Sequence, residues 1–240
     1  MGGQSGPRLH RRTVLQGGLG AAAGLALVPF ASGTSYAAVR ELYRGCMGED
    51  VRALQKTLAS KGYWCGTADG DFGELTQQAV WAVQKQNGLV RDAIVGPLTR
   101  RALANGSLPR PVGGSGTRVE VHLRKQLLLV VKDGRTTMAL NTSTGNGEYY
   151  WLNGRRYRAT TPTGSWKVYS AYSKGWQYGD LGKMWKPMYY NSGWAVHGST
   201  SIPPWPASHG CSRLSVRAMN MLWSTGTMYV GSRVTIATGA

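Results

Sequence analysis

The spacing of apolar residues divides the chain into a helical part and a strand-rich part. Within residues 41–103, apolar side chains recur at helical intervals from Val51 and again from Thr76, which places them on one face of each helix. A shorter third helix is predicted to begin at Pro97, because proline lacks the N–H that the first turn of a helix leaves unpaired. Residues 66–73 are dense in Gly and Asp and predict a loop.

From Arg118 onward the period becomes that of strands. Residues 119–123 alternate between apolar and polar, and residues 126–132 form a nearly continuous apolar run. An Asp-Gly pair at 133–134 predicts a hairpin turn. One helix is predicted after Ser215, whose hydroxyl can cap its first turn. Further strands are predicted around Trp166, at 194–196 and at 228–236. We therefore expect a multidomain chain: a small three-helix bundle followed by a mostly-β (α+β) domain.

Gly, Ser and Pro concentrate between the two parts and mark a boundary. Gly and Ser make such a segment flexible, and its prolines stiffen the first half. The predicted division is an N-terminal segment at 1–37, a helical domain at 38–103, a flexible linker at 104–117 and a second domain at 118–240.

The N-terminal segment has the organisation of an export signal. Arg11 and Arg12 precede the apolar stretch 17–30, and small residues at Ser35 and Ala37 frame a cleavage site after Ala37. The arginine pair resembles a twin-arginine signal. A buried helix is the alternative. The expected location is outside the cytoplasm, in the cell wall or secreted, with no stable membrane span after signal removal, since the apolar stretch is short.

Charge narrows the class of partner. The net charge is +17, and most of the excess lies in residues 118–240. Such a positive charge is suited to binding a polyanion, and export argues against nucleic acid as that partner. An anionic wall polymer is therefore the expected partner, held by interactions that salt weakens. Residues 118–240 also hold most of the Trp and Tyr and no Phe. These aromatics, including 149–151 and 185–190, either line a wet groove or simply pack in sheets.

The three cysteines fall into two groups. Cys46 and Cys65 lie in the helical part, and we predict a disulfide between them, which would contribute about 3 kcal/mol in the chain-entropy model. Two free buried thiols are the alternative. Cys211 is then left over, close to two histidines, and an odd thiol in that setting is a candidate nucleophile.

The segment 197–213 is the strongest candidate for chemistry, and three interpretations compete. His197 or His209 could activate Cys211 as a thiolate nucleophile. The same three side chains could hold zinc with one open position, although no carboxylate second shell is evident. They could also be structural. Acidic residues are scarce from 118 onward, so we expect a group other than a carboxylate, such as a backbone carbonyl, to orient the base.

Two stretches resemble known families. Residues 48–103, with Asp69-Gly70-Asp71-Phe72-Gly73 and Ile94-Val95-Gly96-Pro97, resemble the three-helix peptidoglycan-binding domain. One departure is Ala93, where that family usually has Gly. A purely structural spacer is the alternative. From about Arg118 to Ile236 the chain resembles the L,D-transpeptidase catalytic domain, often called YkuD-type, on the string Ser208-His209-Gly210-Cys211-Ser212-Arg213, the upstream His197-Gly198 and Thr161-Pro162-Thr163-Gly164.

The second resemblance implies a reaction. Cys211 would attack the bond before the terminal D-alanine of a peptidoglycan stem peptide, with His197 as base and the Gly198 carbonyl orienting it. The thioester would pass to a neighbouring stem's side-chain amine, giving a 3→3 cross-link. The alternatives are transfer to water, which makes an L,D-carboxypeptidase, and an inactive wall-binding protein.

The remaining implied site residues are supporting ones. Ser208, His209 and Gly210 would support the loop and the oxyanion, and Arg213 would hold a substrate carboxylate. Tyr189 and Trp194 are further candidates for substrate contact. No metal or cofactor is expected, and the expected partners are stem peptides and glycan, bound by a monomer.

Overall fold

The computed structural model describes residues 39–239. The predicted export signal at 1–37 lies outside the described residues. No helix within 39–239 combines the length and the apolar character needed to cross a membrane.

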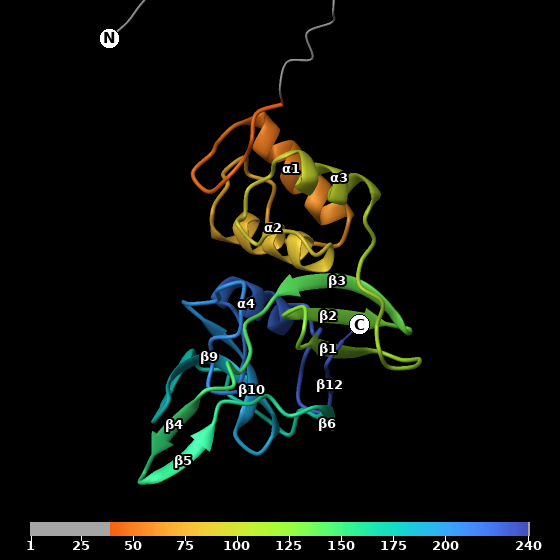
Figure 1. Cartoon of the computed structure of the whole chain (residues 1–240). Helices are drawn as coiled ribbons and strands as arrows, with labels where there is room; N and C mark the ends of the chain where they lie inside the picture. Colours follow the sequence, from red (N-terminus) through yellow and green to blue (C-terminus); the bar gives the residue numbers. More distant parts are fainter. Residues whose placement is uncertain (1–38, 240) are drawn as a thin grey trace, which may run out of the picture. The chain divides into compact units, whose positions relative to one another are not determined.

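The N-terminal part of the described chain is helical, as the apolar spacing predicted (Figure 1). Val51 and Leu58 are fully buried on the first helix, and Val80 and Val83 on the second. The helices are α1 (Glu49–Ser60), α2 (Glu74–Gln86) and α3 (Pro97–Asn105), the last starting at the predicted proline.

Two glutamines hold the loops that follow the first two helices. Gln55 Nε2 donates to Asp69 Oδ1 at 2.8 Å, and Gln84 Nε2 donates to Asp92 Oδ1 at 2.7 Å. Gln84 Oε1 also accepts from the N–H of Ala93 at 3.0 Å. Ala93 has φ 62°, in the left-handed region that favours glycine. The Gln84 hydrogen bond therefore stabilises alanine in a turn where the peptidoglycan-binding domain that this region resembles usually has glycine.

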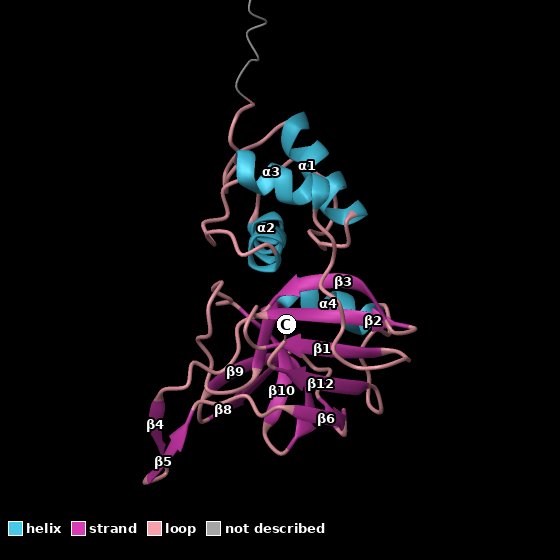
Figure 2. Ribbon diagram, turned by 45° about the vertical axis from the view of Figure 1, so that its right-hand side comes forward, coloured by secondary structure: helices cyan, strands magenta, loops and turns pink. Residues whose placement is uncertain are grey.

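The C-terminal part contains two sheets and a hairpin, which confirms a mostly-β domain (Figure 2). The first sheet has the order β3-β2-β1-β12-β6: β1 (Arg118–His122), β2 (Leu127–Lys132), β3 (Arg135–Asn141), β6 (Gly164–Lys167) and β12 (Arg233–Ala237). The second has the order β11-β10-β9-β7, with β8 also on β9: β7 (Ser170–Ala171), β8 (Trp176–Gly179), β9 (Gly182–Asn191), β10 (Trp194–Ser199) and β11 (Ser212–Ser215). β4 (Tyr149–Leu152) and β5 (Arg155–Arg158) form the separate hairpin.

Two local predictions are confirmed. Asp133 and Gly134 join β2 to β3 with φ 49° and 73°, the positive values that a two-residue hairpin turn requires. The Ser215 hydroxyl accepts from the N–H of Ala218 at 3.1 Å and caps α4 (Val216–Ser224).

The apolar run in β2 is continuous because both faces of this strand are buried. Leu127, Leu129 and Val131 pack with the helical residues, whereas Leu128 and Val130 pack inside the β domain. Successive side chains of a strand point to opposite faces, so two cores require apolar residues at every position. The helical part and the first sheet therefore share one hydrophobic core.

Lys85 adds a polar contact to this junction. From α2, its buried Nζ donates to Gln126 O at 2.7 Å and to Thr142 O at 3.0 Å, and it also contacts Asn141 Oδ1. Burial, with a smaller contribution from Arg91, lowers the pKa of Lys85 well below its usual value. Three oxygen partners compensate for the desolvation of its ammonium group.

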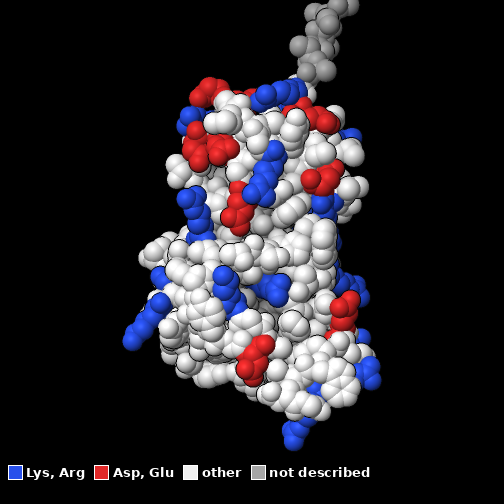
Figure 3. Space-filling model, turned by 90° about the vertical axis from the view of Figure 1, so that its left-hand side faces the viewer, with Lys and Arg blue, Asp and Glu red and all other residues white. Residues whose placement is uncertain are grey.

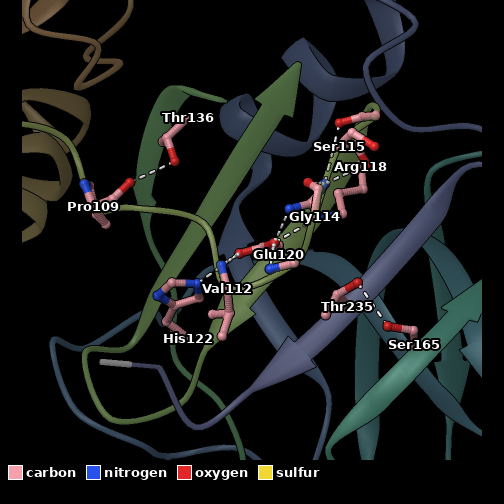
Figure 4. Close-up of polar contacts among 12 residues, drawn as sticks. Pro109, Val112, Gly114, Ser115, Arg118, Glu120, His122, Thr136, Ser165 and Thr235 are labelled. Atoms are coloured by element: carbon pink, nitrogen blue, oxygen red, sulfur yellow. Dashed lines mark hydrogen bonds and ion pairs between the residues drawn. The ribbon is translucent and has the colours of Figure 1, made fainter. Parts of the chain in front are cut away.

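Most of the predicted flexible linker 104–117 is held in place, which corrects that prediction: α3 includes residues 104–105, and residues 109–116 are hydrogen-bonded to β1 and β3 (Figure 4). Its N–H groups at Val112 and Gly113 donate to the Glu120 carboxylate at 2.9 and 3.0 Å. Arg118 donates to the carbonyls of three linker residues from Gly114 onward. The Gly, Ser and Pro content of this segment does not reveal these contacts, because they depend on the buried charged residues Arg118 and Glu120 of β1.

Glu120 is the centre of this attachment. It is fully buried between Arg118, at 2.7 Å, and His122, at 2.9 Å. Burial opposes ionisation of this carboxyl, but hydrogen bonds from His122, two backbone N–H groups and Arg118 outweigh it and lower the pKa to about 2. A charged Glu120 therefore joins the linker to β1.

The predicted disulfide is wrong in this structure, because Cys46 and Cys65 are both free thiols. The Cys65 thiol points into the helical core and donates to Gln55 O at 3.4 Å. Burial raises its pKa to about 11, so it behaves as a small apolar core residue.

Candidate active site

The register of two parallel strands gathers the candidate residues on one face. In the pairing of β10 with β11, His197 lies opposite Arg213. Cys211 is two residues before Arg213 and directly precedes β11. Because side chains two residues apart along an extended chain share a face, His197, Cys211 and Arg213 are placed on the same side of the sheet. Tyr189 of β9 is opposite Ala195, two residues before His197, and joins that face.

His197 is a buried, neutral imidazole oriented by a backbone carbonyl. Its Nδ1 is 2.9 Å from Gly198 O, and since a carbonyl only accepts, Nδ1 carries the proton and Nε2 is left as an acceptor. Burial and the charge of Arg213 lower the pKa of His197 to about 4, although the Gly198 hydrogen bond acts the other way. No carboxylate contacts the ring among residues 39–239. At neutral pH this side chain can accept a proton.

Gly198 leaves no room for a side chain. A Cβ there would meet Trp185 Cβ at 2.9 Å and the Val216 Cα at 3.2 Å. The close approach of β9 and α4 therefore fixes the peptide whose carbonyl holds His197.

Cys211 rests as a thiol. Burial raises its pKa, while a hydrogen bond from the backbone of Ala195 and the charge of Arg213 lower it by less. The Sγ donates weakly to Gly193 O at 3.6 Å. A protonated thiol would need a base to become a nucleophile, and the neutral imidazole of His197 lies on the same face of the sheet.

The bend before Cys211 is held by Ser208. The Ser208 hydroxyl donates to Cys211 O at 2.6 Å and accepts from the N–H of Gly210 at 3.0 Å. The Gly210 N–H is thus engaged and does not point freely at a substrate, contrary to the expected part of this group in an oxyanion site. Within residues 39–239, the N–H of Cys211 has no hydrogen-bond partner.

Thr161 and Trp194 support the same bend from outside. Thr161 Oγ1 donates to Gly210 O at 2.6 Å, and Trp194 Nε1 donates to Thr160 O at 2.9 Å. Gly210 has φ 142°, and a Cβ on it would meet Trp194 Nε1 at 2.7 Å. The indole N–H of Trp194, expected to contact substrate, is therefore used within the protein.

His209 makes no hydrogen bond to the loop in the described chain and contacts the β4–β5 hairpin instead. Its side chain is exposed and packs edge-on against Tyr150 of β4, with ring centroids 4.8 Å apart. Ser208 takes the supporting position because its short hydroxyl reaches both neighbouring backbone groups.

Tyr189 and Arg213 differ in whether their polar groups already have partners within the protein. Tyr189 OH donates to Gln177 Oε1 at 2.9 Å. Arg213 is half-buried, and its guanidinium has no hydrogen-bond or ion-pair partner within the described chain. A partly desolvated, unpaired guanidinium is suited to a carboxylate.

Sequence reasoning gave no role to the residues behind the site. Thr161 was noticed only as part of a motif. Thr142 Oγ1 donates to Arg213 O at 2.8 Å, and Ser143 exchanges backbone hydrogen bonds with Arg213. A run of buried polar residues at 141–144 was the available signal, since such groups require partners. No group of three metal-ligating side chains occurs within 39–239.

Comparison with known proteins agrees with this architecture. Residues 116–236 match the family described as "L,D-transpeptidase catalytic domain", and residues 47–103 match "Putative peptidoglycan binding domain". The first match spans half of the chain, and the protein therefore belongs to the L,D-transpeptidase catalytic domain family.

One solved structure resembles most of the described chain. The L,D-transpeptidase from Xylanimonas cellulosilytica is 50% identical, with a TM-score of 0.79, covering 82% of this chain and 98% of that one. This coverage exceeds the catalytic match alone, so the likeness extends into the helical part.

Curated relatives match a shorter stretch. The chain is 45% identical over 65 residues to the N-acetylmuramoyl-L-alanine amidase CwlL of Bacillus licheniformis, covering 26% of this chain and 18% of the relative. It is 43% identical over 56 residues to the N-acetylmuramoyl-L-alanine amidase CwlM of Mycobacterium tuberculosis, covering 23% and 14%. The chain thus spans less than a fifth of either relative.

Proposed function

We propose that this protein is a peptidoglycan L,D-transpeptidase that forms 3→3 cross-links through a thioester on Cys211. The observation that carries the proposal is the neutral His197, held through Nδ1 by the Gly198 carbonyl, on the sheet face that Cys211 and the unpaired Arg213 share. A base, a thiol and a free cation are the groups that acyl transfer from a stem peptide requires.

The first half-reaction forms the thioester. His197 Nε2 takes the thiol proton as the Cys211 sulfur attacks the carbonyl carbon of the third stem residue. The unpartnered N–H of Cys211 is the nearest candidate to stabilise the resulting oxyanion. As the C–N bond to D-alanine breaks, His197 returns the proton to the leaving amine. Arg213 holds a substrate carboxylate.

The second half-reaction decides the product. A side-chain amine of a neighbouring stem attacks the thioester, His197 accepts its proton, and the cysteine thiol is regenerated. The same thioester transferred to water would make the protein an L,D-carboxypeptidase, and an inert site would leave a wall-binding protein.

The proposed location is the cell wall, reached through the export signal at 1–37. The match of residues 47–103 to a putative peptidoglycan-binding domain supports this location. On the face in Figure 3, acidic side chains gather on the helical part, while Lys and Arg predominate over the sheet domain. Attraction to anionic wall polymers therefore resides in the sheet domain, and adsorption to isolated wall should weaken as salt rises. Salt-insensitive adsorption would contradict this part of the proposal.

The reaction is tested by incubating the purified protein with disaccharide-tetrapeptide and weighing the products. A cross-linked dimer with release of D-alanine supports transpeptidation, and tripeptide alone supports the carboxypeptidase. An unchanged substrate would overturn both enzymatic assignments.

A further inference from the structure

The loop between the proposed base and nucleophile is held by the helical part of the chain. We define the active-site loop as residues 198–210. Gln78 of α2 donates through Nε2 to the Ile202 carbonyl at 3.3 Å. Arg91, which follows α2, donates through Nη1 to the Pro204 carbonyl at 2.8 Å. Neither side chain has a part in the proposed chemistry.

These contacts matter because the first half of the loop borders open space. A cleft of about 520 Å³ lies between α2 side chains, including Gln77 and Trp81, and loop residues 199–203. Thr200 and Ser201 are exposed beside the cleft, whereas Ile202 and Pro204 are buried, so the loop turns from solvent into the protein at this point. Asn141 Nδ2 also donates to Ile202 O, at 3.2 Å, and to Gln78 Oε1. Hydrogen bonds to the Ile202 and Pro204 carbonyls hold the chain at the edge of the cleft.

The second half of the loop transmits this placement to the nucleophile. Thr144 O accepts from the N–H groups of Ala207 and Ser208 at 3.0 and 2.9 Å. Ser208 then binds both Gly210 and Cys211 through its hydroxyl. Asn141, on the same segment as Thr144, contacts both Gln78 and the Ile202 carbonyl, so loss of the helical anchors would reach the bend that sets the position of the Cys211 sulfur.

We propose that Gln78 and Arg91 are positioning residues, through which the helical part fixes the active-site loop and thereby the reactivity of Cys211. This inference rests on the proposed transpeptidase function for the reaction it affects. It gives the helical part a task in catalysis that is separate from any binding of the wall.

The kinetic test compares a double variant with a matched control. In Gln78→Leu/Arg91→Met, neither side chain can donate, and the loop loses both helical anchors. We expect kcat on disaccharide-tetrapeptide to fall about tenfold with KM little changed, since small misplacements of a reacting group are costly. A second double variant, Gln78→Leu/Arg91→Lys, keeps a donor at position 91. It should recover part of the lost rate. Lys125→Met removes another contact between the two parts, to Gln86 Oε1 at 3.0 Å, without touching the loop, and should leave kcat unchanged.

Hydrogen exchange supplies a readout that needs no turnover. In the Gln78→Leu/Arg91→Met double variant, the hydrogen-bonded amides of Ala207, Ser208 and Gly210 should exchange about tenfold faster. The amides of β2 should stay protected, and Lys125→Met should exchange as the wild type does. Equal kcat and equal exchange in the double variant and the wild type would overturn the positioning role. A wild type without turnover would overturn the proposed function instead, and the exchange result would still decide whether the anchors hold the loop.

Discussion

At the scale of residues, the surroundings of the proposed catalytic pair favour neutral side chains. Burial lowers the pKa of His197 to about 4 and raises that of Cys211. The resting pair is therefore a neutral thiol and a neutral imidazole, and not a thiolate and an imidazolium. In the proposed reaction, the thiol proton passes to His197 only as the sulfur bonds to the substrate. A buried site with no carboxylate on the imidazole supports that order of events.

The same burial makes stability depend on pH. The pKa of His197 is about 4 in the folded protein and near 6.5 when unfolded. The unfolded chain therefore binds more protons between these values, and the free energy of unfolding should fall as pH drops from about 6.5 to about 4, by on the order of 3 kcal/mol. Urea unfolding at pH 7 and pH 4 measures this. His197→Gln should shrink the difference, and an unchanged difference in that variant would contradict the assignment.

Gly210 permits no side chain. At φ 142°, a Cβ would stand 2.7 Å from Trp194 Nε1 and 2.8 Å from Thr160 O, so the bend must shift in Gly210→Ala. We expect kcat/KM to fall at least about 100-fold. Gly114→Ala, whose Cβ would meet nothing within 4 Å, is the control and should behave as wild type. Comparable rates for the two variants would show that the bend does not set the nucleophile.

At the scale of elements, β1 carries charges that organise its surroundings. Glu120 accepts hydrogen bonds from the linker, Arg118 and His122. Replacing it with glutamine would leave Arg118 as a buried charge without its ionic partner, and removing one partner of a buried pair is strongly destabilising.

We therefore expect Glu120→Gln to lower the free energy of unfolding by about 3–5 kcal/mol and to speed hydrogen exchange at 112–113. Glu148→Gln, at an exposed carboxylate, should change stability little. Denaturant unfolding of both variants makes the comparison. Equal, small effects would mean that the Glu120 cluster does not hold the linker.

The elements were predicted better than their junctions. Apolar periods located the helices, the Asp-Gly pair located the hairpin, and the Ser215 cap located the last helix, because each of these signals depends on neighbouring residues. The linker contacts and the free thiols were not foreseen, since they depend on partners far along the chain. In the candidate site, the sequence motif predicted Cys211, His197 and Gly198. The hydrogen bonds of Ser208 and Thr161 could not be predicted, because they depend on the bend of the chain before Cys211.

At the scale of the whole molecule, one hydrophobic core connects the helical part to the first sheet, although the two parts match different families. Leu129 of β2 is fully buried with the helical residues, so the helical part completes its core only against the first sheet. The described chain, residues 39–239, should therefore unfold in one transition and not as a tethered module and an enzyme.

Leu129→Ala tests this shared core. It should cost about 2–5 kcal/mol and lower the stability of the helices and the sheet together. Val90→Ala, at an exposed position, is the control. Exchange protection lost from the helices alone would contradict a single cooperative unit.

The central claim is that Cys211 carries the acyl group. Its most direct test is the mass of the Cys211 peptide after incubation with a tetrapeptide donor whose side-chain amine is blocked, so that only water can resolve the thioester. The account predicts an added tripeptide acyl mass on Cys211, release of D-alanine, and neither event in Cys211→Ala. D-Alanine release that persists in Cys211→Ala would contradict it.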